Sequence, residues 1–518
     1  MSEIIDLEMQ LQKDVMNIKK LAEKAGLDFF PVNFEVITKK AMVEFGTYAL
    51  PNRYSHWTFG KDYGRLKKLS NLGVLEILEM VLNSDPATAF LLDSNTTVEH
   101  KMVIAHVFAH CDFFKRNYWF SKTNRNMINE AKFHERRIHE LESEYGKKTV
   151  EEFLDICISI QWHVDFYNVF KPKESKVKVI PSAARSRYFT SDDFDSAYPE
   201  PDSDADPESC SNCEHHGEGE KEGTCKNDGK VKAGTVISSQ QPSSPSQDSN
   251  STQQASLRDL DNAESTPTST EDEFEERDLL KFLMKEAPLT NWQKEVLQIV
   301  HDEIIYFIPT ALTKIMNEGW ATYWHTELCR EYLDFEDFSL FAIKHSELMA
   351  SKGLNPYKVG YMIFEDVRKR WDEEFGEGAG LKKIYEVREF EDDVSFIRNY
   401  LTQDICDKCG LFLFEQDSNT GEMVITSTHV EDIKNSIIGE LSNFGKPLIV
   451  VKGANYNDNR ELYMLHKFDG RELDMDYAID VMKALYKIWG RTIHLETVRD
   501  NARTLVSYNG DKPELKNI

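Results

Sequence analysis

Apolar residues recur at helical spacing along most of the first 395 residues of the chain. Helical periodicity runs through residues 3–25, 35–46, 64–83, 96–118, 125–145 and 149–170, and again through 277–286, 292–329 and 335–350. We expect Pro309 to kink or break the segment 292–329, because proline removes a helical hydrogen bond. Thr290 is suited to cap the start of that helix. This pattern predicts a large, mainly helical domain.

The pattern changes to short runs of β-forming residues after about residue 395. Amphipathic helices at 430–444 and 475–488 separate these runs, which is typical of a compact α+β module. The predicted strands are 410–416, 422–428, 446–453, 461–469, 492–498 and 502–508. We therefore expect a smaller C-terminal α+β domain at residues 396–518, and an α+β fold class for the whole chain.

An acidic stretch interrupts the helical pattern between residues 191 and 275. It holds 21 acidic against 5 basic residues and includes a tract rich in Ser, Gln and Pro at 237–256. Few large apolar side chains are present to offset the entropy of ordering, so we expect this insert to be disordered. The helical domain is then assembled from two parts, residues 1–190 and 276–395.

Composition excludes several classes of function. The chain of 518 residues has a net charge of −27, which argues against binding nucleic acid by neutralising phosphates. No apolar run approaches the roughly 20 residues of a membrane-spanning helix, and the N-terminus lacks the pattern of a signal peptide. Eight cysteines, mostly scattered, suit a reducing compartment. We expect a cytoplasmic protein.

Metal-ligand chemistry lies within two apolar helices. His106 and His110 are four residues apart, and Glu318 and His325 are seven apart, so each pair shares one helix face. The first helix is apolar almost all round, which predicts burial. Two buried imidazoles one turn apart have a common partner in a divalent metal ion.

The spacing of HVFAH matches the HExxH motif of zinc peptidases, with Val107 where the catalytic glutamate would stand. NEGWATYWH resembles the downstream helix that supplies a third, glutamate ligand in such enzymes. This analogy predicts a zincin-like zinc site of His106, His110 and Glu318, with Glu318 also a candidate catalytic residue. The alternative is that the histidines are hydrogen-bonded core residues.

Without a glutamate at Val107, another group must act as the general base if the site is catalytic. Asp112, Glu130 and His325 are the candidates in the sequence, and we take His325 as the catalytic one. The metal could otherwise serve structure or redox chemistry.

His134 shares an apolar stripe with Met127, Ala131 and Ile138, so it faces inward. It is interpreted as a fourth metal ligand or as a partner that orients one. A core histidine with satisfied hydrogen bonds is an equally good reading.

The cysteine pairs are weaker candidates. Cys210, Cys213 and Cys225 could form a zinc knob together with two histidines, but they lie in the acidic insert. Cys406 and Cys409 have no second CxxC pair and are interpreted as incidental, half-buried thiols.

Longer strings carry a family resemblance. On these strings the chain resembles the stage V sporulation protein R (SpoVR-like) family, over essentially all residues outside 191–275. The strings are GLDFFPVNFEVI (26–37), ALPNRYSHWTFGKDYG (49–64), AHVFAHCDFFKRNYWFSKTNRNM (105–127), NEGWATYWH (317–325), LNPYKVGYMIFEDVRKRW (354–371) and EVREFEDDVSFIRNYLT (386–402). The resemblance implies a cytoplasmic protein with a role in sporulation and spore cortex formation. It also implies a PrkA-type serine kinase and a von Willebrand A-like protein as partners.

Two functional hypotheses remain from the sequence. The first is a zincin-like metal hydrolase acting on peptide or peptidoglycan-precursor bonds. The second is a regulator or scaffold without enzymatic activity, whose metal is structural. Val107 favours the second, and the joint presence of His106, His110 and Glu318 favours the first. The main expectation is a cytoplasmic protein that binds a divalent metal in a degenerate zincin-like site. A metal-free scaffold or regulator, acting with the PrkA-type kinase and the von Willebrand A-like protein, stays an open alternative.

Overall fold

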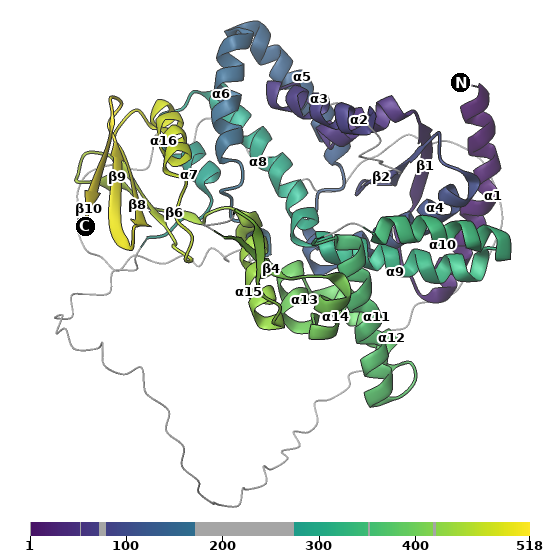
Figure 1. Cartoon of the computed structure of the whole chain (residues 1–518). Helices are drawn as coiled ribbons and strands as arrows, with labels where there is room; N and C mark the ends of the chain where they lie inside the picture. The colour runs from purple at the N-terminus through teal and green to yellow at the C-terminus, as the bar shows by residue number, and fades with distance from the viewer. Residues whose placement is uncertain (1, 52, 72–78, 171–273, 351–352, 418–420) are drawn as a thin grey trace, which may run out of the picture. The chain divides into compact units, whose positions relative to one another are not determined.

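A computed structural model describes residues 2–51, 53–71, 79–170, 274–350, 353–417 and 421–518 (Figure 1). Its α-helices are α1 (Ser2–Ala25), α2 (Lys39–Tyr48), α3 (Trp57–Asn71), α4 (Thr97–Arg116), α5 (Met127–Tyr145), α6 (Lys147–Ile160), α7 (Leu279–Glu286), α8 (Asn291–Leu312), α9 (Lys314–Tyr332), α10 (Phe335–Met349), α11 (Pro356–Phe375), α12 (Ala379–Phe390), α13 (Asp393–Tyr400), α14 (Gln403–Cys409), α15 (Val430–Leu441) and α16 (Met475–Trp489). The predicted α+β class is confirmed. The finer prediction, a zincin-like helical domain, stays a prediction.

A small sheet stands beside the N-terminal helices. Strands β1 (Val32–Ile37) and β3 (Ala87–Leu92) run parallel, and β2 (Glu79–Leu82) pairs antiparallel with β3 at one edge. The predicted helices 35–46 and 64–83 are therefore wrong over β1 and β2. Short apolar runs fit a strand and a buried helix equally well, and only pairing between distant segments decides between them.

Helices α4, α9 and α11 pack together around the first core, a cluster of buried apolar residues that includes Phe108, Trp320 and Phe364. Two glycines allow a close approach of α9 and α11. A Cβ placed on Gly319 would lie 2.4 Å from backbone atoms of Gly360, so no larger residue fits at that crossing. The contact fixes where the side chains next to Gly319 point.

The long helical segment predicted at 292–329 is divided in two. Helix α8 contains Pro309 and ends at Leu312, and α9 starts at Lys314 after Thr313, whose φ of −130° leaves the helical region. Thr290 and Gln293 form a capping box at the start of α8, which confirms the predicted cap.

The second core joins the last part of the chain to α6, α7 and α8. It includes Val150, Leu280 and Val300 on the helices and Leu462 and Ile493 on a five-stranded sheet. That sheet has the order β10-β9-β8-β7-β6 and is packed against α16. Its strands are β6 (Ile449–Tyr456), β7 (Glu461–His466), β8 (Ile493–Arg499), β9 (Ala502–Tyr508) and β10 (Pro513–Asn517).

The buried apolar residues that the structure describes in the segment 396–441 pack in the first core and not in the second. Phe396, Ile405 and Ile433 belong to the first core, and β4 (Leu413–Gln416) pairs with β5 (Met423–Ser427) in a separate hairpin. Side chains of the expected domain 396–518 thus enter both cores. Its independence as a folding unit, like the division of the helical domain into 1–190 and 276–395, stays a prediction.

The acidic insert 191–275 falls outside the described residues except for its last two, and so do Cys210, Cys213 and Cys225. Cys406 and Cys409 are buried in the first core, where they were expected to be half-buried. Within the described ranges, no helix combines the length and the apolar character needed to cross a bilayer.

Candidate metal centre

Helix α4 presents two histidines to one point. A capping box starts the helix, in which the Glu99 N–H donates to Thr96 Oγ1 and the Thr96 N–H donates to Glu99 Oε2. All residues from 98 to 114 except Lys101 are buried. His106 and His110 lie one turn apart with ring centroids separated by 4.5 Å, so both imidazoles face the same side of the buried helix.

A buried carboxylate locks α4 against its neighbours. Asp112 accepts hydrogen bonds from the Trp320 indole at 2.9 Å, from Arg388 at 3.0 Å and from the Asp28 backbone N–H at 2.8 Å. These contacts tie α4 to α9 and α12. With α9 in this place, Glu318 faces the two histidines.

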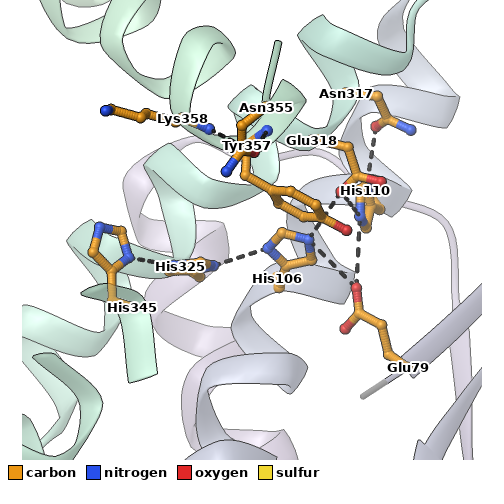
Figure 2. A network of polar contacts seen from close by, with 10 residues as sticks. All are labelled: Glu79, His106, His110, Asn317, Glu318, His325, His345, Asn355, Tyr357 and Lys358. Carbon is orange, nitrogen blue, oxygen red and sulfur yellow. Dashed lines mark hydrogen bonds and ion pairs between the residues drawn. The ribbon is translucent and has the colours of Figure 1, made fainter. Parts of the chain in front are cut away.

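Two carboxylates converge on the two imidazoles, as Figure 2 shows. Glu79 Oε1, from strand β2, lies 3.4 Å from His106 Nε2 and 3.7 Å from His110 Nε2. Glu318 Oε2 lies 3.5 Å and 3.6 Å from the same two nitrogens. Candidate ligand atoms of Glu79, His106 and His110 all lie within 4.8 Å of one another.

These separations suit an ion better than direct hydrogen bonds. Good N–H···O bonds measure about 2.7–3.2 Å, which is shorter than all four N···O distances. Neighbouring ligands around tetrahedral zinc, with bonds of about 2.0–2.2 Å, stand about 3.3 Å apart. In addition, Glu79 Oε2 and Glu318 Oε2 are buried and receive no hydrogen bond from the described residues. The donor set of two imidazoles and two carboxylates fits zinc.

The far nitrogen of His110 is already engaged. His110 Nδ1 lies 2.9 Å from Asn317 Oδ1, which only accepts, so the ring carries its proton on Nδ1. The Nε2 lone pair is then directed at the carboxylates. Burial, reinforced by the charge of His106, lowers the pKa of His110 to about 4, so that the ring stays neutral as a ligand must.

A chain of imidazoles stands behind His106. His106 Nδ1 lies 2.8 Å from His325 Nδ1, and His325 Nε2 lies 3.1 Å from His345 Nδ1 (Figure 2). Burial, together with the neighbouring histidines, lowers the pKa of His325 well below its ordinary value. A neutral His325 accepts the Nδ1 proton of His106 and leaves His106 Nε2 free to bind a metal.

The two carboxyl groups differ in their electrostatics. Burial raises the pKa of Glu79 to about 7, and the Glu318 charge adds to this effect. Burial also opposes the charge of Glu318, but its close approach to His106 and the charges of both histidines outweigh it, so the pKa of Glu318 is lowered. Burial likewise opposes a charged His106, yet the Glu79 and Glu318 carboxylates raise the pKa of His106 overall.

Tyr357 closes one side of the cluster. It lies in the first turn of α11, where Asn355 caps the helix and Pro356 takes the first position. Its ring lies over His106, with centroids 6.1 Å apart (Figure 2). Burial and the charges of Glu318 and Glu79 raise the pKa of Tyr357 well above its ordinary value, which keeps the phenol protonated.

The structure brings together three of the residues selected from the sequence, His106, His110 and Glu318, and places His325 one layer behind them. It does not bring His134 to the cluster. His134 Nδ1 lies 3.3 Å from Glu303 in a separate buried network, because the inner face of α5 packs against α8.

Two further base candidates also lie elsewhere. Asp112 is held by Trp320 and Arg388, and Glu130 accepts a hydrogen bond from Asn124. Among the described residues, neither forms a hydrogen bond or an ion pair with the histidine cluster, so neither occupies the place of the missing glutamate.

Glu79 and Tyr357 were not predicted from the sequence as residues of the site. Glu79 fell in a segment read as helix, although a single acid beside the apolar run Met80–Leu82 could have marked an inward-facing strand position. The Asn-Pro-Tyr sequence at 355–357 signals a helix start but carries no information about what the tyrosine faces.

Two family models match the chain, and both describe SpoVR-like proteins. The model described as "SpoVR like protein" matches residues 6–446, and that described as "SpoVR-like C-terminal domain" matches residues 447–500. The "Uncharacterized protein YcgB" of Escherichia coli (strain K12) is 26% identical over 517 residues, covering 92% of this chain and 90% of that protein. No solved structure matches the chain.

Proposed function

The chain belongs to the SpoVR-like protein family, and from its buried histidine cluster we propose that it is a zinc-dependent hydrolase. His106, His110 and Glu318 would hold the ion, with Glu79 beside them. One observation carries this proposal: both Nε2 atoms stand 3.4–3.7 Å from two carboxylate oxygens, as ligands around an ion do. A bound zinc ion would supply a Lewis acid that polarises the carbonyl group of a substrate.

Glu79 is the group that takes the place of the missing glutamate. Val107 is fully buried in the first core, so α4 offers no carboxylate at the HExxH position. The two carboxyl groups have different pKa values and therefore suit different roles. Glu318, whose pKa is lowered, stays ionised and is suited to be a metal ligand. Glu79, whose pKa burial raises to about 7, exchanges a proton with the attacking water.

Tyr357 is suited to stabilise the negative charge that develops on the substrate oxygen. A phenol that stays protonated donates a hydrogen bond to an oxygen that gains negative charge during attack on a carbonyl. Its place over His106 brings the hydroxyl near Glu318 and Glu79, within the cluster rather than at its edge.

Metal content tests the ligand assignment. We expect about one zinc per chain in the purified protein, loss of zinc in His110→Ala and Glu318→Gln, and retention in Glu79→Gln, all measured by mass spectrometry of the metal. His100→Ala is the matched control, since His100 is a buried histidine on the same helix outside the cluster. Equal zinc in the wild type and His110→Ala would overturn the site.

Activity tests the assignment of Glu79. On a fluorogenic peptide library, Glu79→Gln should abolish hydrolysis while keeping zinc, because the ligands remain but the proton acceptor is lost. A metal-loaded protein that hydrolyses no member of the library would instead favour the structural role of the metal.

The biological setting is proposed from the family alone. A role in sporulation and spore cortex formation, a cytoplasmic location, and partnership with a PrkA-type serine kinase and a von Willebrand A-like protein follow from that resemblance. Affinity purification of the tagged chain from its native host tests the partnership, and absence of both proteins from the eluate would contradict it.

A further inference from the structure

A cavity of about 560 Å³ lies in the second core, away from the metal centre. Its walls come from the end of α6, the segment before β6, strand β7 and one face of α16. None of its lining residues belongs to the histidine cluster. The volume falls within the roughly 300–1,000 Å³ of small-molecule sites.

Apolar side chains form a large part of the cavity wall. Ile449, Met464 and Leu495 line it from strands β6, β7 and β8. Val481 and Leu485 line it from helix α16. Trp162 adds an aromatic side chain from the end of α6. An apolar body of several carbon atoms is therefore the part of a ligand that these walls accept.

The acidic residues of the rim already have partners. Asp469 forms an ion pair with Arg471, whose Nε lies 3.1 Å from Asp469 Oδ2. Glu472 accepts from the Asp500 N–H at 2.8 Å, and Asp474 caps α16 by accepting from the Tyr477 N–H at 3.1 Å.

Lys446 and His163 differ from those acids. Neither side chain has a hydrogen bond or ion pair among the described residues, although both line the cavity. Burial and the positive charge of Lys446 lower the pKa of His163 to about 4, so that a neutral imidazole stands near a free ammonium group. Lys446 is exposed and His163 is half-buried. A ligand anion can therefore reach the ammonium group from solvent while its apolar body enters the cavity.

We propose that this cavity is a second binding site, for a small molecule with an apolar body and one anionic group. The anion pairs with Lys446 and accepts from His163, while the body lies between β7 and α16. Lys446 is the last residue matched by the first family model, so the walls combine residues of both matched segments. Binding there would link the sheet to α6 and α7.

Two probes with the same ring system test the proposal on the full chain. 1-Anilinonaphthalene-8-sulfonate carries an anionic group, and N-phenyl-1-naphthylamine is its uncharged counterpart. We expect the wild type to bind the sulfonate severalfold more tightly, as a single contact with an exposed ammonium group provides. Lys446→Gln should remove this difference by weakening the sulfonate alone. Lys487→Gln, an exposed lysine of α16 outside the cavity, should change neither affinity.

Filling the cavity gives a second measurement. Ala478 lines it from α16, and Ala478→Phe should abolish saturable binding of both probes while near-ultraviolet circular dichroism shows a folded protein. Equal binding of the two probes by the wild type, no effect of Lys446→Gln, or unchanged binding in a folded Ala478→Phe variant would each overturn the proposal.

Discussion

Two buried clusters of histidine and glutamate in this protein differ in how they are completed. In the first, Arg53 Nε donates to Glu303 Oε2 at 2.6 Å and His134 Nδ1 lies 3.3 Å from Glu303 Oε1. The Arg53 guanidinium also lies 4.4 Å from the centre of the Phe59 ring. This cluster contains its own cation.

In the candidate metal centre the same residue types lack such a cation. Among the described residues, no lysine or arginine forms an ion pair with Glu79 or Glu318, and both carboxylates lie 3.4–3.7 Å from the imidazole nitrogens. A buried carboxylate needs a charged or hydrogen-bonding partner. The comparison teaches that a buried His/Glu cluster indicates a ligand site only where the chain supplies no counter-charge of its own.

Metal removal should give the largest difference between the two clusters, because only the candidate metal centre is expected to bind zinc. Stripping the protein with a chelator should lower the thermal unfolding midpoint by roughly 4 °C, since a ligand at 1,000 times its Kd stabilises by about 4 kcal/mol. Restoring zinc should restore the midpoint, as differential scanning calorimetry can show. His110→Ala should be insensitive to the chelator. A wild type that does not respond either would break the comparison.

Breaking the other cluster should affect stability without affecting metal. Glu303→Gln leaves the Arg53 charge buried without its counter-charge, and we expect a loss of about 3–5 kcal/mol in urea denaturation. Zinc content should stay at the wild-type level. Glu331→Gln, in an exposed pair with Lys24, is the control and should change stability by less than about 1 kcal/mol. Zinc loss in Glu303→Gln would show that the two clusters are not independent.

The helix crossing beside the metal centre should be sensitive to one methyl group. Gly319→Ala forces α9 and α11 apart, since its Cβ would meet the backbone of Gly360, and we expect a loss of about 1–3 kcal/mol with reduced zinc occupancy. Gly439→Ala, in α15 with nothing within 4 Å of the new Cβ, should stabilise by about 0.4–1 kcal/mol. Unchanged zinc occupancy in a destabilised Gly319→Ala would show that Glu318 is not positioned by this crossing.

The smallest expected effect is a pH dependence of zinc affinity. Below its pKa of about 7 Glu79 is neutral, and above it the carboxylate is charged, so affinity should rise severalfold from pH 6 to pH 8. Glu79→Gln should flatten the curve, because it also removes the main charge that raises the pKa of His106. Competition with a zinc-sensitive dye measures both proteins. An unaltered slope in the variant would assign the titration to another group.

Much of the helical framework could be predicted from the pattern, since α1, α4, α5 and α10 lie within a few residues of the expected ranges. The N-terminal sheet could not. Strands β1 and β2 are short apolar runs whose type depends on pairing with β3, so the periodicity of a single segment does not distinguish them from helix. The α+β character of the C-terminal residues followed from short runs of β-forming residues, two of which form β8 and β9.

The same division holds for the candidate site. The sequence by itself determined that His106 and His110 share one face of a buried helix, because the rotation per residue of an α-helix is a local property. Only the tertiary structure decided which carboxylates meet them. Glu79 from β2 and Glu318 from α9 lie beside the two histidines. His134 instead contacts Glu303. Such meetings depend on how separately formed elements pack, down to a glycine pair at one crossing, and no spacing along the chain encodes that contact.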